Sequence, residues 1–133
     1  MPSLLLDTHI LIWWQLDSRR LAREHAALLE EQERLGRPLG ISAISLWEIA
    51  MMVARGRLEV SKPLDLWLEE MEASPLLVIL PLTARVATES VRLGDDFQRD
   101  PADRIIVATA RCHGLRLLTA DERIRRWGKV PLA

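Results

Sequence analysis

The stretch SLLLDTHILIWWQL, residues 3–16, decides the fold class of this chain. The short apolar run 3–6 is typical of a buried strand, and it ends at Asp7. Residues 8–16 are apolar nearly all round, which predicts a helix that packs on more than one side. An acidic residue therefore stands at the junction between a buried strand and a buried helix.

The same alternation of strand and helix continues along the chain. Further strands are expected at 39–42, 76–80 and 115–118, with a last edge strand at 130–132. Helices are expected at 20–35, 43–55, 64–73, 83–93, 101–113 and 121–127. This alternation predicts an α/β fold in a single domain over 1–133, with a mainly parallel central sheet of four to five strands flanked by helices on both faces.

The composition is typical of a globular protein of the cell interior. The chain has 133 residues, 49% of them hydrophobic and 28% charged, which suits one domain with its own core. Cys112 is the one cysteine, so an intrachain disulfide is impossible and a cysteine-based zinc site is not expected. The first residues lack the basic start of an export signal, and no apolar run approaches the ~18 residues of a membrane span. We therefore expect a cytoplasmic protein that does not enter the membrane.

The balance of charge leaves a nucleic-acid partner open. The formal net charge of −1 argues weakly against such a partner, because nucleic-acid binders are often basic. Of the 18 cationic side chains, however, only Lys62 and Lys129 are lysines. Arginine binds phosphate through a planar, two-pronged set of donors that lysine lacks, so this bias argues weakly for nucleic acid. Genome composition or adaptation to heat explains the arginine bias equally well.

Four acidic residues stand at similar places in this predicted topology. Asp7 follows the first strand, and Asp121 comes three residues after the strand that ends at residue 118. Glu48 lies about one and a half helical turns beyond the second strand, and Asp103 lies in the first turn of the helix at 101–113. Ligands of open parallel sheets bind beyond the carboxyl ends of the strands. We therefore expect two or more of these acids to converge on one pocket.

A cluster of carboxylates favours a particular chemistry. The carboxylates repel one another and stay ionised together only when a cation neutralises them. Their hard oxygen atoms favour Mg²⁺, with Mn²⁺ as an alternative, over zinc. A magnesium ion that keeps waters in its shell lowers the pKa of one of them and stabilises charge on a phosphoryl group. The cluster therefore predicts hydrolysis of a phosphodiester bond.

Helix capping is the competing explanation for each acid taken alone. Asp100 followed by Pro101 is a good helix start, and Asp103 then faces free backbone amides. The segments 119–122 and 45–48 both have the spacing of a capping box. Any one of these acids is explained by capping more often than by catalysis.

Two of the acids fit the capping explanation less well. Ser42 is an equally good cap for the helix at 43–55, and in that case Glu48 lies beyond the first turn and needs another role. Asp7 has no capping role if Thr8 opens the helix. Four acids at topologically similar places therefore favour one shared site over four separate coincidences.

The acids lie in segments that resemble a known family. The chain looks like a PIN-domain ribonuclease of the VapC toxin type in LLLDTHILIWW at 4–14, ISAISLWEIAMMVARGRL at 41–58, DPADRIIVATAR at 100–111 and LLTADERI at 117–124. These segments span nearly the whole chain. The resemblance implies a PIN-like α/β fold and magnesium-dependent endonuclease activity on RNA, as the toxin of a type II toxin–antitoxin system. It also implies a VapB-like, DNA-binding antitoxin that blocks the site, and commonly a homodimer.

The resemblance also implies roles for the four acids. Asp7 and Asp103 would be the principal metal ligands, and Glu48 and Asp121 would ligate the metal or position its waters. All four are therefore expected to be both catalytic and metal-binding residues.

Three neighbouring residues are expected to bind substrate: Thr8, Arg104 and Thr119. Thr119 would sit at the pocket edge and bond a carboxylate or a phosphate oxygen. Arg104 is either a phosphate or carboxylate clamp near the metal or the ion-pair partner of the acid before it. Related toxins often have a histidine where this chain has Gln98, so we expect the 94–101 loop to contact substrate differently.

Two other functions are alternatives to the nuclease. A signalling receiver domain needs an aspartate after the middle strand, where this chain has Pro81, and a lysine near a later strand end, whereas Lys129 is too close to the end. A catalytically silent PIN-like protein-binding module predicts the loss of at least one acid, and all four are present. Trp13, Trp14 and Trp47 could stack on bases, but their aliphatic neighbours favour packing in the core or at a dimer interface.

Overall fold

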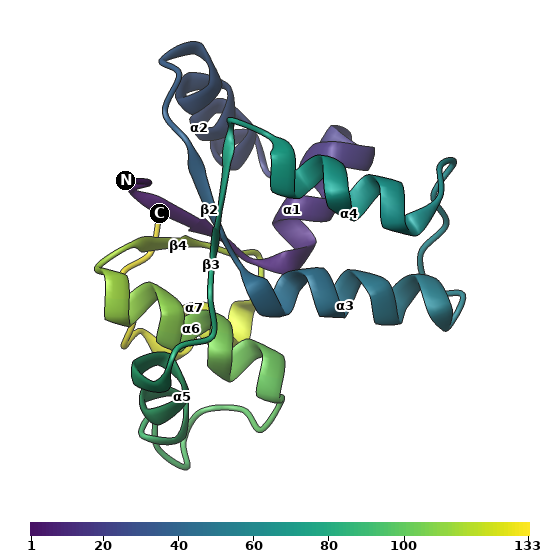
Figure 1. The fold of residues 1–133 in the computed structure, drawn as a ribbon. Helices are drawn as coiled ribbons and strands as arrows, with labels where there is room; N and C mark the ends of the chain where they lie inside the picture. Colours follow the sequence, from purple (N-terminus) through teal and green to yellow (C-terminus); the bar gives the residue numbers. More distant parts are fainter.

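The computed structural model describes residues 1–133 and shows a parallel sheet between two layers of helices (Figure 1). The sheet has the strand order β3-β2-β1-β4, and every neighbouring pair is parallel. The strands are β1 (Leu4–Leu6), β2 (Leu39–Ser42), β3 (Leu77–Leu80) and β4 (Arg116–Leu118). The helices are α1 (Thr8–Leu16), α2 (Arg23–Arg34), α3 (Ala43–Ala54), α4 (Leu64–Ala73), α5 (Ala84–Val91), α6 (Pro101–His113) and α7 (Glu122–Trp127). The predicted α/β fold, with a parallel central sheet and helices on both faces, is confirmed.

The register of the sheet brings the carboxyl ends of three strands to one level. Leu6 of β1 pairs with Ile41 of β2 on one side and with Leu118 of β4 on the other. The chain leaves all three strands at the same edge of the sheet, where side chains from distant parts of the sequence can meet. The residues at this edge are Asp7, Ser42 and Thr119.

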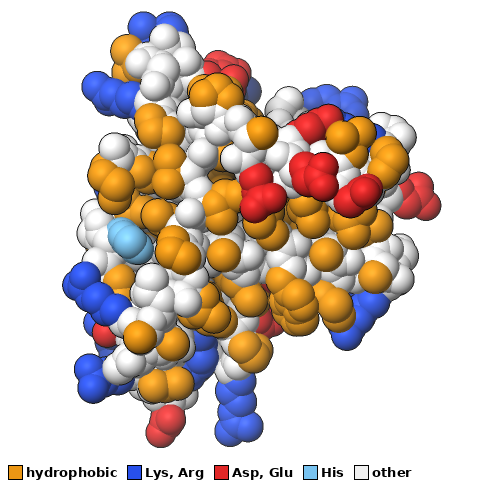
Figure 2. Space-filling view, in the orientation of Figure 1, with side chains coloured by type: hydrophobic (Ala, Val, Ile, Leu, Met, Phe, Trp, Pro, Cys, Tyr) orange, Lys and Arg blue, Asp and Glu red, His pale blue; other side chains and the backbone are white.

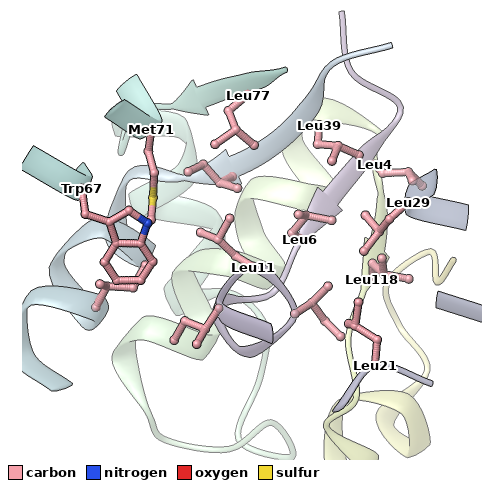
Figure 3. Packing of buried hydrophobic residues seen from close by; sticks show 14 residues of the cluster. Leu4, Leu6, Leu11, Leu21, Leu29, Leu39, Trp67, Met71, Leu77 and Leu118 are labelled. Carbon is pink, nitrogen blue, oxygen red and sulfur yellow. The ribbon is translucent and has the colours of Figure 1, made fainter. Parts of the chain in front are cut away.

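The sheet separates two hydrophobic cores. Leu4 and Leu6 join the core that α1 to α4 cover, whereas Leu5 points to the opposite face and joins the core under α6 and α7. Figure 3 shows the first core, where side chains from α1, α2 and α4 converge on the leucines of the sheet. Because β1 is fully buried on both faces, the residue that follows it is fixed in position by the packing of the whole domain.

The first layer of helices differs from the sequence prediction at one place. The helix predicted over 20–35 begins only at Arg23, because Ser18–Arg20 forms a 3-10 turn and Leu21 is extended. The side chain of Leu21 is buried in the first core, and the extended backbone there carries it inward. Neither this helix nor any other is both long and apolar enough to cross a membrane.

The predicted edge strand at 130–132 is reduced to a single bridge. Leu132 pairs with Leu117 of β4 in parallel orientation, outside any regular strand. Val130 is instead buried in the second core, so the chain runs alongside β4 only at the bridge. The sheet therefore has four strands, the lower of the two numbers expected.

Candidate active site

Asp7 lies where β1 ends and α1 begins. Its backbone N–H donates to the carbonyl of Leu118 at 3.0 Å, which ties the start of α1 to β4. Its Oδ1 accepts from the N–H of Thr8 at 2.8 Å, and its Oδ2 accepts from the hydroxyl of Thr119 at 2.6 Å. Asp7 is therefore the N-cap of α1. The prediction that it has no capping role is wrong, because a helix that opens at Thr8 makes Asp7 the residue that caps it.

Burial dominates the electrostatics of Asp7. The side chain is 6% exposed, and this burial raises the pKa of its carboxyl above the ordinary value. Hydrogen bonds from Thr119 and Thr8 and the charge of His9 act in the opposite direction, whereas the charge of Asp121 adds to the rise. Asp7 is thus a buried acid whose charged form needs a partner.

Glu48 reaches the same place from α3. Ser42 caps this helix by accepting from the N–H of Ile44 at 3.2 Å, so Glu48 has no part in the cap. The Thr8 hydroxyl donates to Oε1 of Glu48 at 2.5 Å and lies 2.8 Å from the Ser45 hydroxyl, which must be the donor in that second bond. Burial is the main cause that raises the pKa of Glu48 to about 7, with repulsion from nearby carboxylates adding to it.

Asp103 and Asp121 share the amide of Gln98. Asp103 is in the first turn of α6, and Asp121 is the N-cap of α7. Nε2 of Gln98 donates to Oδ2 of Asp103 at 2.8 Å and to Oδ2 of Asp121 at 3.2 Å. Burial, with repulsion from nearby carboxylates, raises the pKa of Asp103 to about 6 in spite of this bond. Burial also raises the pKa of Asp121, but bonds from Arg123 and Gln98 outweigh it and hold that pKa below its usual value.

The structure brings the four predicted acids into one site. The charges of Asp7 and Asp103 act on Glu48, and the charges of Asp7 and Asp121 act on Asp103. The donor set consists of hard carboxylate oxygens, which is the chemistry that a magnesium ion requires. As the side chains stand, no group of three or more His, Cys, Asp or Glu is arranged to hold an ion. The amide of Gln98 occupies oxygens of two of the acids instead.

Thr8 and Thr119 hold acids in place rather than contact a substrate. They are 1% and 0% exposed, so neither hydroxyl reaches the surface of the site. Thr8 bonds to Glu48, and Thr119 bonds to Asp7, a carboxylate being one of the two partners expected for Thr119. The expectation that they bind substrate directly does not fit this burial.

Arg104 fits neither of the two roles expected of it. It forms no ion pair. Four of its N–H bonds go to backbone carbonyls of Ser90, Gly94, Phe97 and Gln98. A guanidinium engaged in this way is not available as a clamp for phosphate or carboxylate, and it fixes a loop instead.

A groove beside Glu48 was not expected from the sequence. It has a volume of about 480 Å³ and lies between α3 and the start of α6. Figure 2 shows hydrophobic side chains exposed over α3, next to acidic side chains over α4. Trp47 is 56% exposed in this groove, so it does not pack in the core, and its packing at a dimer interface stays a prediction. Trp13 and Trp14 do pack against the first core. The groove also contains the basic residues Arg55 and Arg57.

Comparison with known proteins gives the family and the fold of this chain. A family model described as PIN domain matches residues 4–130. The chain is 35% identical over 125 residues to Ribonuclease VapC22 of Mycobacterium tuberculosis, which covers 94% of this chain and 92% of that protein. The structure is similar to FitAcB from Neisseria gonorrhoeae, with a TM-score of 0.70, 26% identity, and coverage of 97% of this chain and 95% of that chain. It is also similar to a chain of a toxin–antitoxin complex from Klebsiella pneumoniae, with a TM-score of 0.58, 27% identity, and coverage of 90% and 87%.

Proposed function

Since the chain belongs to the PIN domain family, we propose that it is a magnesium-dependent endoribonuclease that hydrolyses RNA phosphodiester bonds at the acidic site. The observation that carries this proposal is the meeting of Asp7, Glu48, Asp103 and Asp121 from four separate stretches of the chain. The pKa values of Glu48 and Asp103, raised to about 7 and about 6, reflect how strongly burial opposes their negative charge. Such a cluster ionises fully only with a cation, and Mg²⁺ or Mn²⁺ suits its oxygen atoms.

The four acids have different roles in the proposed reaction. Asp7 and Asp103 are the principal ligands of the ion, and Glu48 and Asp121 ligate it or position its waters. When bound, a divalent ion of this kind lowers the pKa of a water molecule and stabilises charge on the phosphoryl group. Without the ion, Glu48 has a pKa of about 7 and is partly protonated near neutral pH, and a bound cation would favour its charged form. The buried threonines Thr8 and Thr119 orient the carboxylates of Glu48 and Asp7 by hydrogen bonds.

The proposed activity belongs to a toxin–antitoxin pair. The relative from M. tuberculosis is named a ribonuclease, and the similar structure from K. pneumoniae is described as a toxin–antitoxin complex. By analogy with these proteins, this chain is the toxin and forms a homodimer. A VapB-like, DNA-binding antitoxin binds it and inhibits its activity. The exposed apolar groove beside Glu48 offers a surface that a protein partner can cover.

Cleavage of a labelled RNA by the purified protein tests the nuclease. We expect cleavage with Mg²⁺ or Mn²⁺ and none with EDTA. Asp7→Asn and Asp103→Asn should each lower the rate by roughly 100- to 1,000-fold, the loss typical when a group that stabilises transition-state charge is removed. Asp65→Asn, an exposed acid in the first turn of α4, is the matched control and should keep the wild-type rate.

Two kinds of result would contradict the proposed metal-dependent nuclease. Cleavage that persists in EDTA, or in a folded Asp7→Asn variant, would show that the acids do not act through a metal. Absence of cleavage together with normal partner binding by both variants would favour the silent binding module instead. Expression in growing cells tests the toxin role. The wild-type chain alone should arrest growth, and the Asp103→Asn variant should not.

A further inference from the structure

The 94–98 part of the loop between α5 and α6 is shaped by one side chain. Nε of Arg104 donates to the carbonyl of Gln98 at 2.9 Å, and Nη1 donates to that of Ser90 at 3.2 Å. Nη2 donates to the carbonyls of Gly94 at 2.9 Å and Phe97 at 3.0 Å. The guanidinium also lies over the Phe97 ring, 5.6 Å from its centre, and Phe97 is buried in the second core. A loop without regular structure is thereby held in one conformation from inside the domain.

These bonds of Arg104, the Arg104 clamp, hold the backbone from which the side chain of Gln98 extends. Arg104 bonds the carbonyls of Gln98 and of the residue before it, so the backbone from which the amide extends is held in place. The amide nitrogen has two hydrogens, and one goes to Asp103 at 2.8 Å while the other goes to Asp121 at 3.2 Å. These two acids belong to different helices, α6 and α7. The Gln98 amide is the group that joins them.

The position of this amide bears on how an ion could bind. Oδ2 of Asp103 and Oδ2 of Asp121 both accept from Gln98, and a cation shared by the two acids needs oxygens that face it. The Gln98 amide gives each carboxylate a hydrogen bond but does not neutralise its negative charge. A divalent ion therefore binds the carboxylates of Asp103 and Asp121 more strongly than the amide does. The ion and the amide therefore compete for the same oxygens.

We propose that Gln98, held by Arg104, is a positioning residue that joins the carboxylates of Asp103 and Asp121 in the metal-free protein and that a divalent ion displaces from them. This inference rests on the proposed function, because it assumes that the two acids take part in binding an ion. Gln98 then lowers the affinity for the ion and stabilises the protein without it. Arg104 acts through Gln98, because it holds the backbone that places the amide near the two acids.

The affinity for Mn²⁺, measured by the electron paramagnetic resonance signal of the free ion, tests the competition. Gln98→Ala should bind Mn²⁺ roughly two- to tenfold more tightly, a change that corresponds to the net contribution of one hydrogen bond. The melting temperature of the same variant in EDTA should fall by a few degrees, because two carboxylates lose the donor between them. Gln15→Ala is the matched control, since Gln15 also makes a side-chain bond, to Trp67, but from the far end of α1. This control should leave Mn²⁺ affinity unchanged.

The clamp is tested by Arg104→Lys, which keeps the positive charge but cannot reach four carbonyls. This variant should also bind Mn²⁺ more tightly, and the double variant Gln98→Ala/Arg104→Lys should bind no more tightly than Gln98→Ala alone. Such non-additivity is expected when one residue acts through another. If Arg104→Lys does not fold, the two readouts on Gln98→Ala still decide the inference.

Weaker or unchanged Mn²⁺ binding by Gln98→Ala, or an unchanged melting temperature in EDTA, would overturn the inference. Weaker binding would mean that Gln98 helps to hold the ion instead of competing with it. These results leave the proposed nuclease intact when wild type binds Mn²⁺ and cleaves RNA. Failure of the wild-type protein to bind Mn²⁺ at all would overturn both.

Discussion

The acidic site has an inner pair and an outer pair that are held by different means: Asp7 with Glu48, and Asp103 with Asp121. The inner pair is held by the hydroxyls of Thr119 and Thr8, which are 0% and 1% exposed. The outer pair is held by the amide of Gln98, which comes from a loop, and by Arg123, whose side chain is 64% exposed. Two carboxylates of the same site are thus fixed by the core, and two are arranged by groups near the surface.

This difference indicates which part of the site can change without unfolding the domain. The hydroxyls that serve the inner pair belong to buried residues at the end of β4 and at the start of α1, so they move only if the sheet or α1 moves. The amide and guanidinium that serve the outer pair can exchange for water or an ion, because their own positions depend on a few hydrogen bonds. We therefore expect substitutions around the inner pair to affect stability and activity together, and those around the outer pair to affect them separately.

Thr119→Val should have the largest effect, because this hydroxyl serves both pairs. It donates to Asp7 and accepts from the backbone N–H of Asp121 at 3.0 Å, so valine leaves two polar groups without a partner. We expect a roughly 10- to 100-fold loss of RNA cleavage, as for other groups that orient metal ligands. The free energy of unfolding should fall by about 1–3 kcal/mol. Cleavage rates and unfolding in urea measure the two effects.

Thr109→Val is the matched control for this substitution. Thr109 is also 0% exposed, but its hydroxyl donates to the carbonyl of Ile105 within its own helix and touches no acid. We expect the wild-type cleavage rate. An equal loss of cleavage in both variants would show that a missing buried hydroxyl, rather than the support of Asp7, causes the effect.

Thr8→Val should have the next largest effect and isolates the inner pair. The bond from Thr8 lowers the pKa of Glu48, so its loss should raise that pKa above about 7. If the ionised form of Glu48 is the active one, a rise of one pKa unit from about 7 lowers the ionised fraction, and with it cleavage, about fivefold at pH 7, and the rate recovers in alkaline buffer. The pH profile of cleavage measures this shift. A loss of the same size at every pH would mean that the orientation of Glu48, and not its charge, depends on Thr8.

The stability of the metal-free protein should fall as the pH rises from about 4 to about 7. The pKa values of Glu48 and Asp103 are raised from 4.5 and 3.8 to about 7 and about 6, so the folded state holds these protons more tightly than the unfolded state. The stabilisation is complete below the unfolded values and is lost as the pH passes through the folded values. Thermal unfolding in EDTA measures the fall, and Mn²⁺ at the upper end of this range should reverse it.

A double variant is the control for this pH dependence. Glu48→Gln/Asp103→Asn removes both titrating groups, and its melting temperature in EDTA should vary less over the same range. Stability of the wild-type protein that rises with pH in EDTA would contradict the direction of both shifts.

Arg123→Ala should have the smallest effect. Its guanidinium lies 3.2 Å from Oδ2 of Asp121 in an ion pair that is open to solvent. We expect the pKa of Asp121 to rise and the cleavage rate to change by about twofold or less, as exposed ion pairs contribute little. Rates at low and high salt measure this. A tenfold loss would indicate that Arg123 contacts the RNA itself and would make the outer pair part of the substrate surface.

The sequence predicts best those elements whose ends carry their own chemical signals. The helix at 101–113 was predicted with its observed bounds because Asp100 and Pro101 open it and Gly114, at a φ of +64°, closes it. The helix over 20–35 was predicted too long because no proline or glycine marks its break. The extended residue Leu21 is set by burial in the core, which depends on elements that are distant in sequence.

Some features of the candidate site could likewise be predicted from the sequence, and others could not. The rule that parallel strands end at one edge of the sheet predicted that two or more of the acids converge, and the resemblance to PIN-domain ribonucleases added that all four belong to one site. The Arg104 clamp could not be predicted from the sequence, because it depends on the directions of three loop carbonyls and of one carbonyl near the end of α5. The hydrogen bonds from Gln98 to Asp103 and Asp121 could not be predicted from the sequence either, since a single amide in a charged loop has no periodicity and no characteristic spacing.

The capping bonds of Asp7 and Asp121 bear on the choice of variant for testing the chemistry. Each of these carboxylates accepts a backbone N–H at the first turn of a helix. Alanine at either position would remove the acceptor and the negative charge together, and an inactive alanine variant could simply be a frayed one. Asparagine is as good a helix cap as aspartate, so it removes the charge and leaves the helix start intact. At these two positions the amide substitution separates catalysis from folding, and truncation does not.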